Sequence, residues 1–249
     1  MKKQISLGLA SALMAGFASA DGLYYVGGQA QESMPLKWVV GADLTYDDNV
    51  TPSSGVKEDA VSINPYVGLS VVSITPQTTW DVYARLGLIY YIDAPDAIDD
   101  VYGQARLGFN VNHRFNERLR FSSRNFASYE LEPDYSYGFA TDRQLSEYFY
   151  WQTDNAIGYR WTERFATYTG FVLSGLDYGS EVPSGDRFSW TVYNQFRYQL
   201  SPQSVLTFDY RYTDTDAAGD SGDSTDHYLL AGIEHRFSPN SILIVKAGA

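Results

Sequence analysis

The feature that most constrains the fold is a series of eleven strand-like segments whose connections alternate strictly between short and long. The short connections are Thr75–Thr78, Asn116–Arg118, Thr162–Arg164, Ser201–Gln203 and Ser238–Asn240. The long connections are Asp47–Asp59, Asp93–Asp100, Glu130–Arg143, Gly179–Arg187 and Asp214–Asp226. This order predicts an antiparallel sheet with tight turns at one rim and long loops at the other, which is typical of an outer-membrane β-barrel.

Apolar and polar residues alternate within these segments with the period of two that a strand with one apolar face requires. In Val205–Thr213, for example, Leu206, Phe208, Tyr210 and Tyr212 alternate with Thr207, Asp209 and Arg211. A slip of one residue would exchange the two faces, so the register is well specified. The sequence therefore predicts an all-β fold, a transmembrane antiparallel up-and-down β-barrel of about 12 or more strands.

The predicted strands are Leu36–Tyr46, Val61–Ser73, Thr79–Tyr91, Val101–Phe115, Arg118–Tyr129, Leu145–Trp161, Phe165–Tyr178, Phe188–Leu200, Val205–Thr213, Tyr228–Phe237 and Ile242–Ala247. Pro65 lacks a backbone donor and predicts a bulge or a place near the rim. Ser122-Ser123 suggests a second bulge. The segments Arg118–Tyr129 and Phe165–Tyr178 do not separate cleanly into two faces.

The first twenty residues have the three parts of a secretory signal peptide. Lys2 and Lys3 precede the apolar stretch Ile5–Phe17, and Ala18-Ser19-Ala20 forms a small-residue cleavage site before Asp21. We therefore expect a signal peptide over residues 1–20, a short periplasmic N-terminal segment over 21–35 and the barrel over 36–249. An even strand count returns both termini to the periplasm, so an unpartnered eleventh strand indicates either that the count is wrong by one or that the barrel is incomplete at its C-terminus, and we favour the second.

The composition excludes several classes of function. The chain has no cysteine, so it contains no disulfide, thiol nucleophile or thiolate-bound metal. Its net charge of −12 argues against a nucleic-acid partner, because phosphates require lysine and arginine. After the signal peptide, no stretch has the roughly 18–20 apolar residues of a membrane helix. We expect neither a cofactor nor a metal.

Aromatic residues at the strand ends predict two interfacial girdles. If the short turns face the periplasm, the periplasmic ends carry Trp38, Trp80, Phe115, Trp161 and Phe237. The outer ends carry Tyr46, Tyr90, Tyr102, Tyr129, Tyr148, Tyr178, Trp190, Tyr212 and Tyr228. In the lipid-facing set between the girdles, we expect arginine at Leu206 or Phe208 to be costly and a charge at Thr207 to be tolerated.

Charged residues on the polar faces of the strands are the candidate functional residues. The predicted lumen-lining set is Asp43, Asp81, Arg85, Arg106, Arg114, Asp154, Arg160, Arg197, Asp209, Arg211, Glu234 and Arg236. A wall of mixed charge can hold water and bias the passage of ions. The alternative is that these residues form structural ion pairs that fill a narrow lumen, as side chains do in barrels of about eight strands.

The long loops carry most of the acidic residues, against only Lys57, Arg143 and Arg187. An acidic rim would favour cations at the mouth of a channel, and it is equally consistent with a solvated surface bridged by divalent ions. The segment Asp214–Asp223 has a weak similarity to a calcium-binding loop, but Ala218 and Thr225 replace required oxygen ligands. A flexible acidic loop is the better interpretation.

His113, His227 and His235 are the only side chains that are bases near neutral pH. An outer-membrane lipase or acyltransferase would need a nucleophile within reach of such a histidine. No nucleophile motif is present, and an amphipathic ring at a strand end suits the membrane interface. We therefore expect that the protein is not an enzyme.

The motif Thr45-Tyr46-Asp47-Asp48-Asn49-Val50, followed by a loop rich in serine and proline and then Ile63-Asn64-Pro65-Tyr66-Val67-Gly68-Leu69, resembles the β-barrel porin 2 family. Members of that family are generally longer, which implies that this chain is the N-terminal part of a barrel. The resemblance supplies no catalytic or binding residues.

The sequence predicts an outer-membrane protein of the Gram-negative envelope, most simply a porin-like passive diffusion channel for small solutes or ions. The alternative is a non-conducting barrel, either a structural or adhesin-type protein or a component of an envelope assembly such as polysaccharide export. The partners expected from this class are outer-membrane lipid, small solutes or ions, and further copies of the chain, with no nucleic acid.

Overall fold

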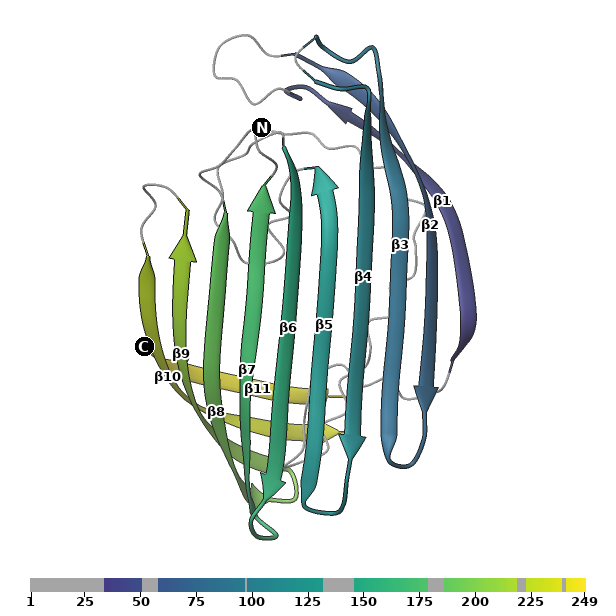
Figure 1. Ribbon diagram of the computed structural model, residues 1–249. Helices are drawn as coiled ribbons and strands as arrows, with labels where there is room; N and C mark the ends of the chain where they lie inside the picture. The colour runs from purple at the N-terminus through teal and green to yellow at the C-terminus, as the bar shows by residue number, and fades with distance from the viewer. Residues whose placement is uncertain are drawn as a thin grey trace.

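The computed structural model describes residues 34–50, 58–96, 98–131, 146–178, 186–218, 223–238 and 241–249 of the 249-residue chain. These residues form one eleven-stranded antiparallel sheet in which every strand pairs with its neighbours in sequence (Figure 1). The strands are β1 (Met34–Asp47), β2 (Ala60–Ile74), β3 (Thr78–Ile92), β4 (Val101–Arg114), β5 (Leu119–Leu131), β6 (Glu147–Arg160), β7 (Phe165–Tyr178), β8 (Arg187–Ser201), β9 (Ser204–Ala217), β10 (Ser224–Ser238) and β11 (Ser241–Gly248). The predicted all-β, up-and-down topology is confirmed.

The connections alternate between short turns and longer loops as the sequence predicts. The short turns lie at the lower rim of the sheet in Figure 1. Several predictions concern residues outside the described ranges. These are the signal peptide, the N-terminal segment up to residue 33, Leu145, and loop residues 51–57, 132–145, 179–185, 219–222 and 239–240.

Several strand boundaries differ from the sequence predictions, and those of β1, β5, β9 and β10 are the ones that change the assignment of a predicted segment or loop. β1 begins at Met34, so the expected N-terminal segment 21–35 overlaps the first strand. Glu130, expected to open a long loop, lies inside β5. Asp214 lies inside β9, and β10 begins at Ser224, ahead of the predicted Tyr228. In β5, β9 and β10 backbone pairing with a neighbouring strand extends past the polar residues that suggested a loop.

The sheet is strongly curved. β10 and β11, drawn in yellow, pass behind the strands in the middle of the sheet (Figure 1). Among the described residues β1 pairs with β2 alone and β11 with β10 alone, so these strands are the two edges of the sheet. The curvature brings residues of β5 and β11 to one cavity, although five strands separate them in the sheet order.

The two faces of the sheet have inverted polarity compared with a water-soluble protein. We call the face that carries Asp43, Arg85, Asp154, Arg197 and Glu234 the inner face, and the opposite one the outer face. Large apolar side chains on the outer face are exposed, such as Val40 (81%), Leu44 (61%) and Ile157 (54%). On the inner face Arg197, Asp209 and Glu234 are 1%, 3% and 6% exposed.

Tyrosines of the inner face lie over glycines of the adjacent strand. The directly opposed pairs are Gly41 with Tyr66, Gly108 with Tyr83, Gly158 with Tyr168 and Gly170 with Tyr193. At each glycine an added Cβ would collide with the tyrosine ring. Because a tyrosine ring needs this space to lie flat on the sheet, the glycines let large side chains cover the concave face.

The main hydrophobic cluster lies on the inner face near the long loops. It consists of Tyr148, Tyr150, Leu176 and Tyr178, with Phe126 packed against it. At this level β6 also carries apolar residues on its outer face, so both faces are apolar there. This cluster explains why the sequences of β5 and β7 do not separate cleanly into a polar and an apolar face.

The two bulges suggested by the sequence are absent. Ser122 and Ser123 pair in continuous register with both β4 and β6. At Pro65 the ladder with β3 is interrupted, but the same register resumes at Tyr66. Register shifts occur instead near the short-turn ends of β1, β8 and β10.

The aromatic residues expected at the strand ends lie in part on the outer face. Of the short-turn residues, Trp38, Phe115, Trp161 and Phe237 are more than half exposed on the outer face, and Trp80 shares this face. At the long-loop end the prediction is wrong for four tyrosines. Tyr148 and Tyr178 are buried on the inner face, and Tyr102 and Tyr228 have inner-face registers. The outer-face members at that end are Tyr46, Tyr90, Tyr129, Trp190 and Tyr212.

No helix capable of crossing a membrane occurs in the described part of the chain.

Candidate functional site

The candidate site is the polar inner face of the sheet, where the strand registers place all the predicted lumen-lining residues. Strand pairing brings together side chains that are far apart in sequence, because residues directly opposite one another share a face. The structure groups most of the charges of this face into four paired clusters.

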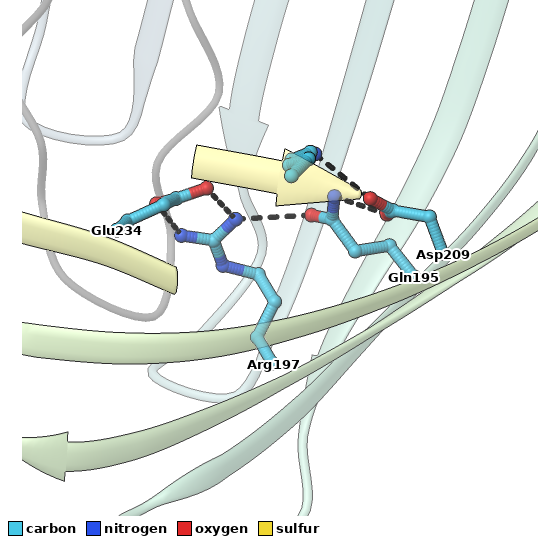
Figure 2. Close-up of polar contacts among 5 residues, drawn as sticks. Gln195, Arg197, Asp209 and Glu234 are labelled. Atoms are coloured by element: carbon cyan, nitrogen blue, oxygen red, sulfur yellow. Dashed lines mark hydrogen bonds and ion pairs between the residues drawn. The ribbon is translucent and has the colours of Figure 1, made fainter. Parts of the chain in front are cut away.

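The most buried cluster extends over β8–β11, and we call it the β8–β11 network. Arg197 donates from both terminal nitrogens to the two Glu234 carboxylate oxygens, at 2.9 and 2.5 Å. It also donates to Gln195 Oε1, and Gln195 Nε2 donates to Asp209 (Figure 2). Lys246 completes the network with a 2.8 Å ion pair to Asp209.

This network satisfies the charges that the sheet buries. Arg197 and Glu234 side chains are 1% and 7% exposed, and a two-point contact of this kind supplies both geometry and hydrogen bonding to the pair. Lys246 lies on β11 and reaches Asp209 across β10, where Gly232 leaves room for its side chain. The cluster therefore joins the four last strands on their concave side.

A cavity of about 250 Å³ lies beside the network. Its lining includes Arg124 of β5, Asp154 of β6, Arg211 of β9 and Ile244 of β11. Strands from the middle and the end of the sheet thus face each other across it. The volume is below the range of about 300–1,000 Å³ that is common for sites of drug-sized ligands, so it suits water, ions or a small solute.

The second cluster joins β5, β6, β8 and β9. Arg124 donates to Asp154 at 2.5 Å, and Tyr193 donates its hydroxyl to the same carboxylate at 2.7 Å. Tyr193 reaches Asp154 across β7 because Gly170 lies beneath its ring. The guanidinium of Arg211 lies 5.7 Å from the centre of the Tyr193 ring.

The remaining two clusters are more open than the β8–β11 network. On β1–β3, Arg85 donates to Asp43 at 3.1 Å, and its guanidinium stacks 3.7 Å from the Tyr66 ring. On β4–β6, Arg106 forms a two-point contact with Glu130, to which the Tyr148 hydroxyl also donates. The side chains of Arg85, Asp43 and Arg106 remain 38–44% exposed, whereas those of Arg197 and Glu234 are almost fully buried.

The other predicted residues lie outside these clusters. Asp81 accepts a hydrogen bond from Asn110 at 2.7 Å. Arg114 donates to the Pro76 carbonyl, and Arg160 lies 3.8 Å from Glu117 in the β4–β5 turn. Arg236 is two residues from the end of β10. Arg114, Arg160 and Arg236 therefore belong to the short-turn rim rather than to the middle of the wall.

The sequence prediction missed Tyr66, Arg124, Glu130, Tyr193, Gln195 and Lys246. The alternation that would identify the inner face of β5 is present in the sequence, at Arg124, Phe126, Ser128 and Glu130. Polar residues also occupy the odd-numbered positions of β5, so this alternation is obscured. Lys246 gives no comparable signal in the sequence, because its role depends on the curvature that brings β11 to Asp209.

The histidines form a repeated contact that the sequence prediction did not include. His113 Nδ1 is 2.8 Å from Thr78 Oγ1, and His235 Nδ1 is 2.9 Å from Ser204 Oγ. Each imidazole packs edge-on against the phenylalanine two residues later, with centroids 4.6 Å apart. The same contact therefore occurs at two turns, once with threonine and once with serine. This repetition indicates a structural role, in which the histidine holds the phenylalanine in place at the rim.

The segment with weak similarity to a calcium-binding loop does not begin as a loop, because its first four residues belong to β9. Asp214 belongs to β9, where its carboxylate accepts hydrogen bonds from Trp190 Nε1 and Thr225 Oγ1, both at 3.1 Å. Within the described residues no group of three or more histidine or acidic side chains is arranged to hold a metal ion.

Comparison with known protein families and with curated proteins finds no match to this chain. The fold defines its class: an all-β protein built from one antiparallel, up-and-down sheet of eleven strands with a polar concave face.

Proposed function

We propose that this chain is an outer-membrane β-barrel protein that acts as a porin-like passive diffusion channel for small solutes or ions. The observation that carries the proposal is the inverted polarity of the sheet. Exposed leucine, valine and phenylalanine side chains cover the outer face, while ion pairs lie on the inner face. This distribution of apolar and charged side chains is stable when the outer face contacts hydrocarbon and the inner face contacts water.

The lengths of the strands support the proposal. β1–β10 contain 13–15 residues each, and a tilted strand needs about 9–11 residues to cross the hydrocarbon core. The alternation of short turns and long loops agrees with the two sides of an outer membrane. The resemblance to the β-barrel porin 2 family, carried by Thr45–Val50 and Ile63–Leu69, is consistent with this class.

Transport through such a barrel needs no cofactor and no covalent step, because pore width and wall charge determine what passes. The arginines of the three clusters outside the β8–β11 network, Arg85, Arg106 and Arg124, remain accessible to solutes, with side chains 38–53% exposed. The proposal therefore places the protein in the outer membrane with lipid as its surroundings and small solutes or ions as its cargo. It includes no catalytic activity.

Conductance of the purified full-length protein in planar lipid bilayers tests the proposal. We expect discrete current steps that are equal in size at a given voltage. The size of the step should increase linearly with voltage, so that the single-channel conductance is constant. A protein that inserts into the bilayer but never conducts would reject the channel, while leaving the barrel architecture standing.

A non-conducting barrel is the second candidate, and the β8–β11 network favours it. Arg197, Glu234 and Asp209 are buried and paired, as expected of side chains that fill a narrow lumen. Such a barrel would serve as a structural or adhesin-type protein or as part of an envelope assembly.

Replacing both Arg197 and Glu234 by alanine separates the two candidates. If the network closes the lumen, the double variant conducts and the unaltered protein does not. If the protein is an open channel, both conduct and the variant differs only in step size. Because the two charges are removed together, neither is left buried without its partner.

A further inference from the structure

The outer face carries a polar patch in the middle of β5 and β6. We call it the outer polar patch, and it consists of Ser123, Asn125, Thr153 and Asn155. Its side chains are hydrogen-bonded to one another. Asn125 donates to Ser123 Oγ at 3.0 Å, Thr153 donates to Asn125 Oδ1 at 2.7 Å, and Asn155 donates to Thr153 Oγ1 at 2.7 Å.

The patch is an exception on an apolar surface. Phe109 of β4 and Phe171 of β7 flank it and are 43% and 44% exposed, and Ile157 of β6 is 54% exposed. The neighbouring strands β7 and β8 add one more outer-face pair of this type, in which Asn194 donates to Thr169 Oγ1 at 2.6 Å. The outer positions of β3 and β9, in contrast, carry apolar residues such as Leu86 and Phe208.

The hydrogen bonds within the patch do not use the full capacity of its side chains. A side-chain amide has two donor hydrogens and an oxygen that can accept two hydrogen bonds. Asn155 donates one bond within the patch, to Thr153. In hydrocarbon the unused groups are costly, and uncharged polar side chains at that depth commonly mark contacts between protein surfaces.

We propose that the outer polar patch is the surface on which a second copy of this chain packs within the membrane. Amides and hydroxyls both donate and accept, so the patch is complementary to itself, as a two-fold interface requires. The described outer positions of β5 carry no charge, and the one charge at an outer position of β6, Glu147, lies at the first residue of that strand, away from the patch; the chain as a whole has a net charge of −12. Two copies of an acidic protein can approach closely only where such charges are absent.

This inference rests on the proposed membrane location, because water would satisfy the patch in a soluble protein. It is independent of whether the barrel conducts. It assigns the interface to β5 and β6, on the opposite side of the wall from the Arg124–Asp154 pair.

The absence of cysteine from the chain allows a direct test. Single-cysteine variants at Ser123, Asn125, Thr153 and Asn155 are reconstituted into phospholipid liposomes and treated with a short bifunctional maleimide. Leu86→Cys and Phe208→Cys, on exposed apolar parts of the outer face, are the matched controls. We expect covalent dimers from one or more of the four patch variants and none from the controls.

A second measurement examines the energy of the contact. Asn125 and Asn155 are replaced together by leucine, and the dimer fraction is measured at a fixed protein-to-lipid ratio. We expect a decrease in association of roughly tenfold or more, because the polar contacts of Asn125 and Asn155 are lost from both copies of a symmetric dimer. The leucine variant remains inserted and folded, since leucine suits lipid contact better than asparagine.

Three outcomes count against the inference. Dimers that form equally at Leu86→Cys and Phe208→Cys would show random collision, and an inserted protein that stays monomeric would leave the patch without this partner. Either result overturns the interface and leaves the proposed function intact. A protein that does not enter liposomes at all removes both the membrane location and the interface.

Discussion

At the scale of single residues, the burial of each ion pair determines how much it contributes to stability. Arg197 and Glu234 are withdrawn from solvent, so each depends on the other for its charge to be tolerated. Arg85 and Asp43 also form a pair between an arginine and a carboxylate, at 3.1 Å. Both side chains remain more than 40% exposed, so water can stabilise each charge without its partner. In the sequence these four residues cannot be told apart in this respect, because all of them occupy inward positions of their strands.

We expect Arg197→Ala to lower the free energy of unfolding by about 3–5 kcal/mol, because it leaves Glu234 buried without a cation. Arg85→Ala is the matched control, with an expected loss of about 0–1 kcal/mol. Urea titration of the protein folded into liposomes measures both values. Equal losses at the two sites would contradict the difference in burial.

At the scale of strands, the inner face is organised by tyrosine rings lying over glycines. The chain contains 21 tyrosines and 21 glycines, and the four opposed pairs use both types in direct register. A glycine in a strand usually weakens it, but here it provides the space that a neighbouring ring fills. At Gly170 this space also lets Tyr193 reach the carboxylate of Asp154.

We expect Gly108→Val to destabilise the protein by about 1–3 kcal/mol, because a side chain at this position displaces the ring of Tyr83. Gly103→Val on the same strand is the control, since the nearest atom to an added Cβ is Tyr129 Cε1 at 3.9 Å. Its expected effect is within about 0.5 kcal/mol. The same urea titration compares the two variants, and a larger loss at Gly103 would refute the tyrosine–glycine explanation.

At the scale of the whole molecule, the outer surface is apolar and the concave surface is charged. The exposed side chains of the described outer face include Val40, Leu86, Leu107 and Phe208, which together form a larger exposed apolar surface than soluble monomers usually carry. Burial also corrects one sequence expectation. Thr207 does lie on the inner face, but it is 4% exposed and close to Gly232, so a charge there is not expected to be tolerated.

The position along the strand also changes the expected effect of arginine on the outer face. Leu107 lies at the middle of β4, where arginine should cost about 2–4 kcal/mol in a bilayer. Leu206 is two residues from the start of β9, so its penalty should be smaller, about 0–1 kcal/mol.

Gln152→Arg is the control for this prediction, because Gln152 is exposed on the inner face at the middle of β6. We expect it to be tolerated. Unfolding titrations in liposomes compare the three arginine variants. Penalties at Gln152 as large as those at Leu107 would mean that the two faces are not in different solvents.

The strands and their order could be predicted because each depends on local chemistry. Alternation in Val205–Thr213 specifies its two faces, and the turn residues around Pro202 and Asn116 mark where the chain reverses. β5 was correctly predicted as a strand, but its two faces could not be assigned, because polar residues occupy both of them. Ser123 and Asn125 belong to a polar patch and Arg124 to an ion pair, and a single sequence cannot assign these two roles to faces.

The sequence by itself determined the eleven strands, their order and, outside β5 and β7, the division into a polar and an apolar face, because these depend on neighbours a few residues apart. The tertiary structure alone decided which charges meet and which are buried. The curvature of the sheet brings Lys246 to Asp209 and Tyr193 to Asp154. It also buries Arg197 together with its partner Glu234. Curvature sums small twists over many strands, so no short segment of sequence contains it.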